Sequence, residues 1–174
     1  MQRIKVKSNT KTNTKNLTIT ALFAALICVT TAYIFHIPFG ANGGYIHIGD
    51  TLIYLAATIL PTPYAMLAGA LGGCLADLLT APMWAPATFI IKLLMTLPFT
   101  SNGKIINKRN VIAIFVATFI SITGYWIAEI ILYGNAAVAV VSIISSAIQA
   151  FCSGILFVVL GLSLDKMNFK RKLS

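Results

Sequence analysis

One stretch of this sequence combines residue types that could bind a small polar molecule. Residues 43–50 (Gly-Gly-Tyr-Ile-His-Ile-Gly-Asp) join two apolar segments and carry one of the two histidines and one of the four acidic residues in the chain. The imidazole of His47 and the carboxylate of Asp50 offer hydrogen-bond donors and acceptors to a ring heteroatom or a hydroxyl group. We therefore expect this loop to form one wall of a small-molecule pocket that opens to the outside of a membrane.

Further polar and aromatic residues interrupt the apolar segments. When these segments are placed as membrane spans, their charged and amide groups fall in the outer half of the membrane. A charge at the centre of a bilayer costs at least about 2.5 to 3.5 kcal/mol, so such groups usually face one another or a cavity. Nearby aromatic rings could stack on a ligand. The predicted binding residues are Tyr45, His47, Asp50, Asp77, Trp84, Lys92, Tyr125, Glu129 and Gln149.

The charged residues of this set also have structural interpretations. Asp50 precedes an apolar segment and could cap a helix that starts there. Asp77 or Glu129 could form an ion pair with Lys92 that serves only the fold. A membrane enzyme would instead use Asp77 and Glu129 as acid and base, but the sequence offers no nucleophile or metal set to accompany them.

The uncharged members of the set have structural interpretations as well. His47 could be held by backbone groups of its own loop. Gln149 could bridge two helices by hydrogen bonds. Trp84 could anchor the chain at the membrane interface instead of stacking on a ligand.

The elements that must position these residues are membrane spans. Hydrophobic residues make up 58% of the 174 residues and charged residues only 10%, with a mean hydropathy of +0.88, whereas about 25% of the residues in soluble domains are charged. The predicted fold is an all-α integral membrane bundle of six transmembrane helices. The expected spans are residues 17–36, 51–60, 64–79, 87–99, 111–132 and 138–164.

The second and fourth spans are too short to cross a bilayer. Ten helical residues cover ~15 Å of a ~30 Å hydrocarbon core, so residues 51–60 must start or end within the membrane. Non-helical backbone at that depth is tolerated only where protein or a water-filled cavity surrounds it. This is a second reason to expect a pocket near Asp50.

The positive charges predict the orientation. Of the 13 lysines and arginines, 12 lie in the two tails or in the connection at residues 101–110, and only Lys92 lies elsewhere, which is the positive-inside pattern. We therefore expect both termini in the cytoplasm, and we do not expect nucleic acid as a partner despite the net charge of +9. The predicted domains are a basic, disordered tail (1–16), a membrane domain (17–164) that retains its first span, and a second basic tail (165–174).

Several chemical classes are not indicated. Cys28, Cys74 and Cys152 have no metal-binding spacing and are expected to be small buried apolar residues. The chain has no phosphate-binding glycine loop and no catalytic triad, so we expect no enzyme activity, no metal and no cofactor. A solute moved uphill would need a partner or an ion gradient.

The sequence resembles the substrate-binding S components of energy-coupling factor (ECF) vitamin transporters over nearly its whole length. The resemblance lies in Ala21 and Ala25 of the first span and in residues 43–50, 76–78 (Ala-Asp-Leu) and 85–92 (Ala-Pro-Ala-Thr-Phe-Ile-Ile-Lys). The last three stretches resemble the branch assigned to hydroxymethylpyrimidine or pyridoxine.

The resemblance implies a multi-pass protein of a bacterial-type cell membrane. It would capture a small vitamin from outside for ATP-dependent uptake, together with a shared transmembrane coupling protein and two ABC-type ATPases. It also implies that Ala21 and Ala25 form the docking face for that partner. A carboxylate suits an aminopyrimidine edge, and a carboxylate with Lys92 suits pyridoxine. An S component for riboflavin or another vitamin, a stand-alone ion-coupled carrier or channel, and a purely structural subunit stay open as alternatives.

Overall fold

Helices make up most of the chain in the computed structural model, which describes residues 9–34, 37–38, 45–134 and 140–173. For residues 9–11, 38, 45, 46, 141 and 142 only the backbone is described. The elements are α1 (Asn9–Tyr33), β1 (Ile37–Pro38), β2 (Tyr45–Ile46), α2 (Gly49–Ile59), α3 (Thr62–Thr80), the 3-10 helix η1 (Pro82–Trp84), α4 (Ala85–Met95), α5 (Lys108–Tyr133), α6 (Val140–Lys166) and α7 (Phe169–Leu173).

The six predicted apolar segments are all present as helices, but they differ in length. Within the described residues, α1, α3, α5 and α6 are long and apolar enough to cross a membrane. The apolar helices Gly49–Ile59 and Pro82–Met95 are shorter. The structure therefore shows four long spans and two short helices instead of six full spans, and the short ones are the two that the sequence predicts to be short.

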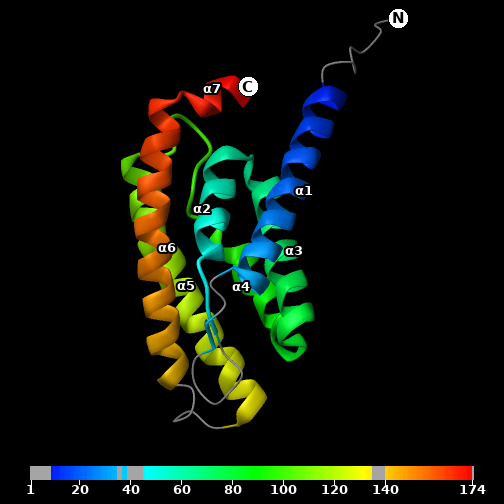
Figure 1. Cartoon of the computed structure of the whole chain (residues 1–174), viewed down its shortest axis with the longest axis vertical. Helices are drawn as coiled ribbons and strands as arrows, with labels where there is room; N and C mark the ends of the chain where they lie inside the picture. The colour runs from blue at the N-terminus through cyan, green and yellow to red at the C-terminus, as the bar shows by residue number, and fades with distance from the viewer. Residues whose placement is uncertain (1–8, 35–36, 39–44, 135–139, 174) are drawn as a thin grey trace, which may run out of the picture.

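Helix α2 lies at the centre of the bundle. Nine of its eleven residues are buried, and it packs against α1, α3 and α6. It begins about halfway between the two ends of the bundle (Figure 1). A helix that starts there places its first turn deep inside the protein, as the short second span requires.

The later turns of α2 lie in an apolar core. The ring of Tyr54 stacks on Phe99 at 5.2 Å between centroids and meets Phe157 edge-on at 5.8 Å. Phe99 and Phe157 are themselves 6.0 Å apart. Edge-to-face and offset aromatic pairs of this kind stabilise a core beyond the area that they bury.

A minimal sheet precedes α2 and was not predicted. Strands β1 and β2 are antiparallel, with Ile37 opposite Ile46 and Pro38 opposite Tyr45. Two extended segments that pair in this way satisfy backbone groups that would otherwise lack partners. The expected all-α fold therefore needs this small correction. Residues 43 and 44 of the predicted pocket loop lie outside the described residues.

The two ends of the described chain lie at the same end of the bundle: α1 starts there and α7 lies there (Figure 1). The expected disorder of residues 1–16 is wrong for residues 9–16, which form the first turns of α1. Once the apolar part of a helix has formed, adding residues at its end requires no new nucleus. Lys15 Nζ also donates to the carbonyl of Leu173.

The connection between α4 and α5 is held by polar side chains at the same end of the bundle. The two carboxylate oxygens of Asp165 accept hydrogen bonds from the backbone amides of Ile105 and Ile106, each at 2.9 Å. Asn110 is fully buried and pairs with both backbone groups of Thr100. The sequence indicated only a polar connection here, because these partners are up to 60 residues apart.

The cysteines differ from the prediction. All three are free; Cys28 and Cys74 are half-buried, and Cys152 is exposed. The expectation of small buried residues is therefore wrong for Cys152. In a membrane bundle an outward-facing apolar residue can meet lipid, so an apolar sequence context does not imply burial in the protein.

Candidate functional site

The centre of the candidate site is a buried ion pair between α2 and α4. Lys92 Nζ lies 2.6 Å from Asp50 Oδ1, and the two side chains are 2% and 0% exposed. Asp50 lies inside the first turn of α2, whose N-cap is Ile48 and has no side-chain cap. The capping role considered for Asp50 is therefore wrong, and its carboxylate is engaged with another helix.

Gln149 and His47 complete the hydrogen-bonding around this pair. Gln149 Nε2 donates to Asp50 Oδ2 at 2.9 Å, and Gln149 Oε1 accepts from the His47 amide at 3.4 Å. His47 Nδ1 accepts from the Gly49 amide at 2.9 Å. The structural interpretations of Gln149 as a bridge and of His47 as a loop residue held by backbone are confirmed, and both residues also border the ion pair.

The other two acids near the site are buried on neighbouring helices. Asp77 is 4% exposed on α3, and Glu129 is 2% exposed on α5, one turn beyond Tyr125. The ion pair of Lys92 that the structure describes is with Asp50. Tyr125 interacts electrostatically with both Asp77 and Asp50, so these two acids lie near one aromatic ring.

Aromatic side chains lie beside the ion pair. Lys92 Nζ is 5.3 Å from the ring centroid of Tyr125, within cation–π range, and the Tyr125 hydroxyl is 3.0 Å from Thr88 Oγ1. The ring of Trp84 packs against Tyr125 at 6.1 Å and against Tyr133 at 6.3 Å. Trp84 is 7% exposed, which argues against an interface anchor, and its indole Nε1 has no hydrogen-bond partner among the described residues.

The structure thus brings most of the predicted residues into one network of contacts. Six of the nine are joined by hydrogen bonds, the ion pair or ring contacts, and Asp77 and Glu129 are buried on the adjoining helices. The side chain of Tyr45 lies outside the described residues. The six are His47, Asp50, Trp84, Lys92, Tyr125 and Gln149.

Two glycines make this arrangement possible. A Cβ added at Gly73 would lie 3.0 Å from Lys92 Cγ and 3.0 Å from Thr88 Cγ2, so the bare backbone of α3 leaves room for the lysine stem. A Cβ at Gly49 would lie 2.1 Å from Thr31 Oγ1, so α1 approaches the start of α2 at this point. Ala65, Gly69 and Gly73 form a small-residue stripe at four-residue steps on α3, a spacing that predicts close packing against another helix, and all three are buried. The effect of Gly73 on Lys92 does not follow from that spacing.

Sequence reasoning missed Thr88 and Ser153. Thr51 Oγ1 donates to the carbonyl of Ser153 at 3.1 Å, which places Ser153 beside the first turn of α2. The side chain of Ser153 is fully buried, and its hydroxyl has no partner within the described ranges. The available signal was spacing, because Ser153 follows Gln149 by four residues and lies on the same face of α6.

This donor and acceptor set suits an organic ring more than a metal ion. Among the described residues, no group of three or more His, Cys, Asp and Glu side chains could hold a metal. The site offers a carboxylate, an ammonium group, an amide and an indole N–H close to aromatic rings. Such a combination fixes the orientation of a flat heterocycle with polar edges.

The predicted docking residues lie on the surface of α1. Ala21 and Ala25 are exposed, so they do not pack inside the chain. Ala24 faces inward instead. A Cβ added at Gly72 of α3 would lie 2.8 Å from the carbonyl oxygen of Ala24. The close α1–α3 contact therefore leaves the Ala21/Ala25 face available to another protein.

Proteins similar to this chain include a curated sequence and a solved structure. A Pyrococcus woesei protein described as an uncharacterized protein in a gap 3' region is 30% identical over 132 residues, which are 75% of this chain and 87% of that protein. The solved S component of a bacterial ECF transporter has the same fold, with a TM-score of 0.71 over 89% of this chain and 98% of that one. At 20% identity this second likeness concerns the fold alone.

A family model extends the comparison to most of the sequence. The model of the ECF-type riboflavin transporter S component matches residues 11–166. This result favours the riboflavin alternative over the expected hydroxymethylpyrimidine or pyridoxine branch, because the matching family is named for riboflavin. It also excludes the enzyme and stand-alone carrier hypotheses, since the family is one of multi-pass membrane subunits of a larger transporter. The chain belongs to the family of ECF-type riboflavin transporter S components.

Proposed function

We propose that the protein captures riboflavin, or a vitamin with a similar flat heterocycle, at the site around Asp50 and Lys92. The riboflavin-type family match supports this ligand class. The observation that carries the proposal is the buried indole Nε1 of Trp84, which has no hydrogen-bond partner among the described residues. A buried donor without a partner costs about 1 to 3 kcal/mol, and a ligand carbonyl would remove that cost.

The chemistry of a flavin edge fits the polar groups of the site. Ring carbonyl oxygens accept hydrogen bonds, which Trp84 and Lys92 donate. A ring N–H donates a hydrogen bond, which the carboxylate of Asp50 accepts. The hydroxyls of a ribityl chain match Ser153, while Tyr125 packs against the ring system.

The proposed transport cycle needs partners. The site opens to the outside and both termini face the cytoplasm, which the positive-inside pattern and the shared end of α1 and α7 support. Uptake then requires the shared transmembrane coupling protein and two ABC-type ATPases of an ECF module. The exposed Ala21/Ala25 face of α1 is the contact surface for that module.

Fluorescence titration of the purified protein tests the ligand. We expect riboflavin to bind at micromolar concentration or below, which a change in the emission of riboflavin itself measures in every variant. Trp84→Phe keeps an aromatic ring at this position but removes the indole N–H donor, and it should weaken riboflavin binding about tenfold. The matched control is Trp126→Phe, because Trp126 is the other tryptophan and lies half-exposed on α5; it should leave affinity unchanged.

A second candidate ligand is pyridoxine or hydroxymethylpyrimidine. The observation that favours it is the Asp50–Lys92 pair at 2.6 Å, whose opposite charges match the ring N–H and phenolate of pyridoxine. Competition decides between the candidates: tight binding of either small ring, with none of riboflavin, would replace the flavin by that ligand. If none of the three bound at micromolar concentration, the proposed ligand class would be wrong.

A further inference from the structure

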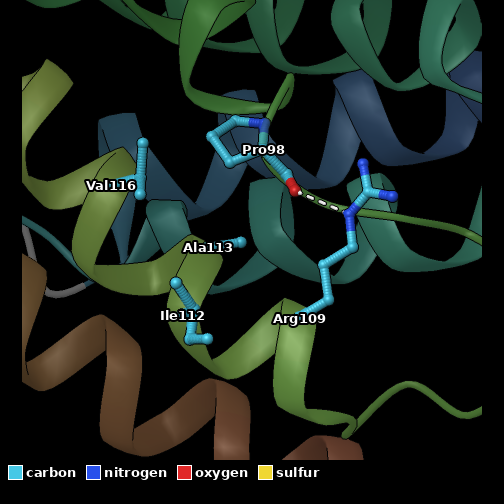
Figure 2. A pocket seen from close by; sticks show the side chains of 5 residues that line it. All are labelled: Pro98, Arg109, Ile112, Ala113 and Val116. Atoms are coloured by element: carbon cyan, nitrogen blue, oxygen red, sulfur yellow. Dashed lines mark hydrogen bonds between the residues drawn. The ribbon is translucent and has the colours of Figure 1, made fainter.

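A groove lies between the segment after α4 and the first part of α5, and it shares no lining residue with the Asp50–Lys92 site. It has a volume of about 360 Å³, and its lining is almost entirely apolar (Figure 2). Four lining residues are spaced i, i+3, i+4 and i+7 on α5, so they share one helix face. The lining residues are Pro98, Arg109, Ile112, Ala113 and Val116.

One end of the groove carries a positive charge. Arg109 Nε donates to the carbonyl of Pro98 at 3.4 Å, which directs the guanidinium group across this end (Figure 2). Arg109 is exposed, and no carboxylate in the described part of the chain forms an ion pair with it. Its terminal nitrogens are therefore available, and a guanidinium group suits bidentate binding of a phosphate. The neighbouring Lys108 is also exposed and adds to the charge.

The rest of the groove suits a hydrocarbon chain. Ile112 and Val116 are 62% and 43% exposed, whereas Ala113 is buried and small. From Arg109 to Val116 the helix rises ~10 Å, so the apolar strip runs from the charged end along α5. Because Arg109 lies in the first turn of a membrane-spanning helix, just after a polar connection, it is placed at the depth of lipid headgroups.

We propose that this groove binds one anionic phospholipid, with its phosphate on Arg109 and an acyl chain along Ile112 and Val116. Charge complementarity selects the occupant. The groove has a guanidinium group at one end and an apolar strip beside it, and a phospholipid has a negatively charged phosphate followed by an acyl chain. The site is separate from the Asp50–Lys92 site and does not depend on which vitamin is bound.

Native mass spectrometry of the full chain tests the proposal. The protein is released from mixed micelles that contain phosphatidylglycerol and phosphatidylcholine in equal amounts, so the two lipids compete for the groove. We expect retention of one phosphatidylglycerol in preference to phosphatidylcholine, and Arg109→Gln should lower that retention about fivefold. Arg171→Gln is the control, since Arg171 is an exposed cation of α7 outside the groove. Equal retention of the two lipids, or an equal loss in both variants, would overturn the proposal.

A second variant tests the acyl strip. Val116→Trp fills the groove without changing charge, and we expect it to reduce phosphatidylglycerol retention while helical circular dichroism stays unchanged. Added inorganic phosphate should not displace the lipid; displacement would mean that Arg109 binds a free anion instead. If Val116→Trp abolished assembly with the coupling module but left lipid retention intact, the occupant would be the partner protein and the lipid proposal would be wrong.

Discussion

The Asp50–Lys92 pair is difficult to explain by stability alone. Removing two charges from water costs more than their attraction returns in many buried pairs, and apolar replacements of similar volume are often neutral or stabilising. Here the pair is almost fully buried and also receives a hydrogen bond from Gln149. A costly arrangement of this kind inside a membrane protein indicates a functional site.

Breaking one side of the pair should be more harmful than removing both. Asp50→Asn leaves the Lys92 ammonium buried without its partner, and we expect a loss of about 3 kcal/mol in the free energy of unfolding. The double variant Asp50→Asn with Lys92→Met should lose less than the sum of the two single variants. Chemical unfolding in detergent, followed by circular dichroism, measures this coupling; additive effects would show that the two charges do not stabilise each other.

At the level of the elements, close helix approach decides which side chains reach the site. Helix α3 passes α4 with a glycine facing the stem of Lys92, and α1 passes the start of α2 with Gly49 facing Thr31. At both positions the glycine lacks a Cβ, and this allows the close contact. The positions of Lys92 and of the first turn of α2 therefore depend on glycines that carry no chemistry.

Gly73→Ala should separate binding from stability. The added Cβ would meet Lys92 Cγ at 3.0 Å and displace the lysine stem, while alanine favours the helix by about 1 kcal/mol. We expect ligand affinity to fall about tenfold, since overpacking typically costs about 1 to 3 kcal/mol, with little change in melting temperature. Gly154→Ala is the control, because its Cβ would meet only Ile114, at 3.1 Å. Equal affinity losses in both variants would contradict the specific role of Gly73.

Gly49→Ala should loosen the contact between α1 and α2. Its Cβ would lie 2.1 Å from Thr31 Oγ1, so the helices must move apart, and we expect a destabilisation of about 1 to 3 kcal/mol. Adding Thr31→Ala removes the clashing hydroxyl and should restore part of that loss. Melting temperatures of the two single variants and the double variant measure the rescue; a double variant no more stable than Gly49→Ala would show that the clash lies elsewhere.

At the scale of the whole molecule, the proposed functions lie on different faces. The proposed ligand site is buried around the start of α2, and the exposed alanines lie on the outer face of α1. The basic residues of α7 lie at the end of the bundle where α1 begins (Figure 1). A change on one face should therefore leave the others intact.

The docking face can be tested in that way. Ala21→Trp with Ala25→Trp places two large side chains on the exposed α1 surface, and we expect vitamin binding to persist while uptake by cells that contain an ECF module is lost. Leu26→Trp is the control, since Leu26 is already large and 53% exposed on the same helix. Uptake unchanged in the double variant would refute the docking assignment.

The sequence by itself determined the class of the molecule and its elements. Apolar length and charge placement predicted a helical membrane bundle, and the short second and fourth segments correspond to α2 and α4. These features are local, because hydrophobicity and helix length are properties of consecutive residues. Even the small-residue stripe of α3 was visible as a four-residue spacing.

Only the tertiary structure decided which polar groups meet. Asp50 and Lys92 are 42 residues apart, and three acids were available to one lysine; the central position of α2 selected Asp50. The same folding left Trp84 with a buried N–H and placed Arg109 at the end of an apolar groove. Contacts between distant helices depend on how closely their backbones approach, and no pattern within a single segment specifies that distance.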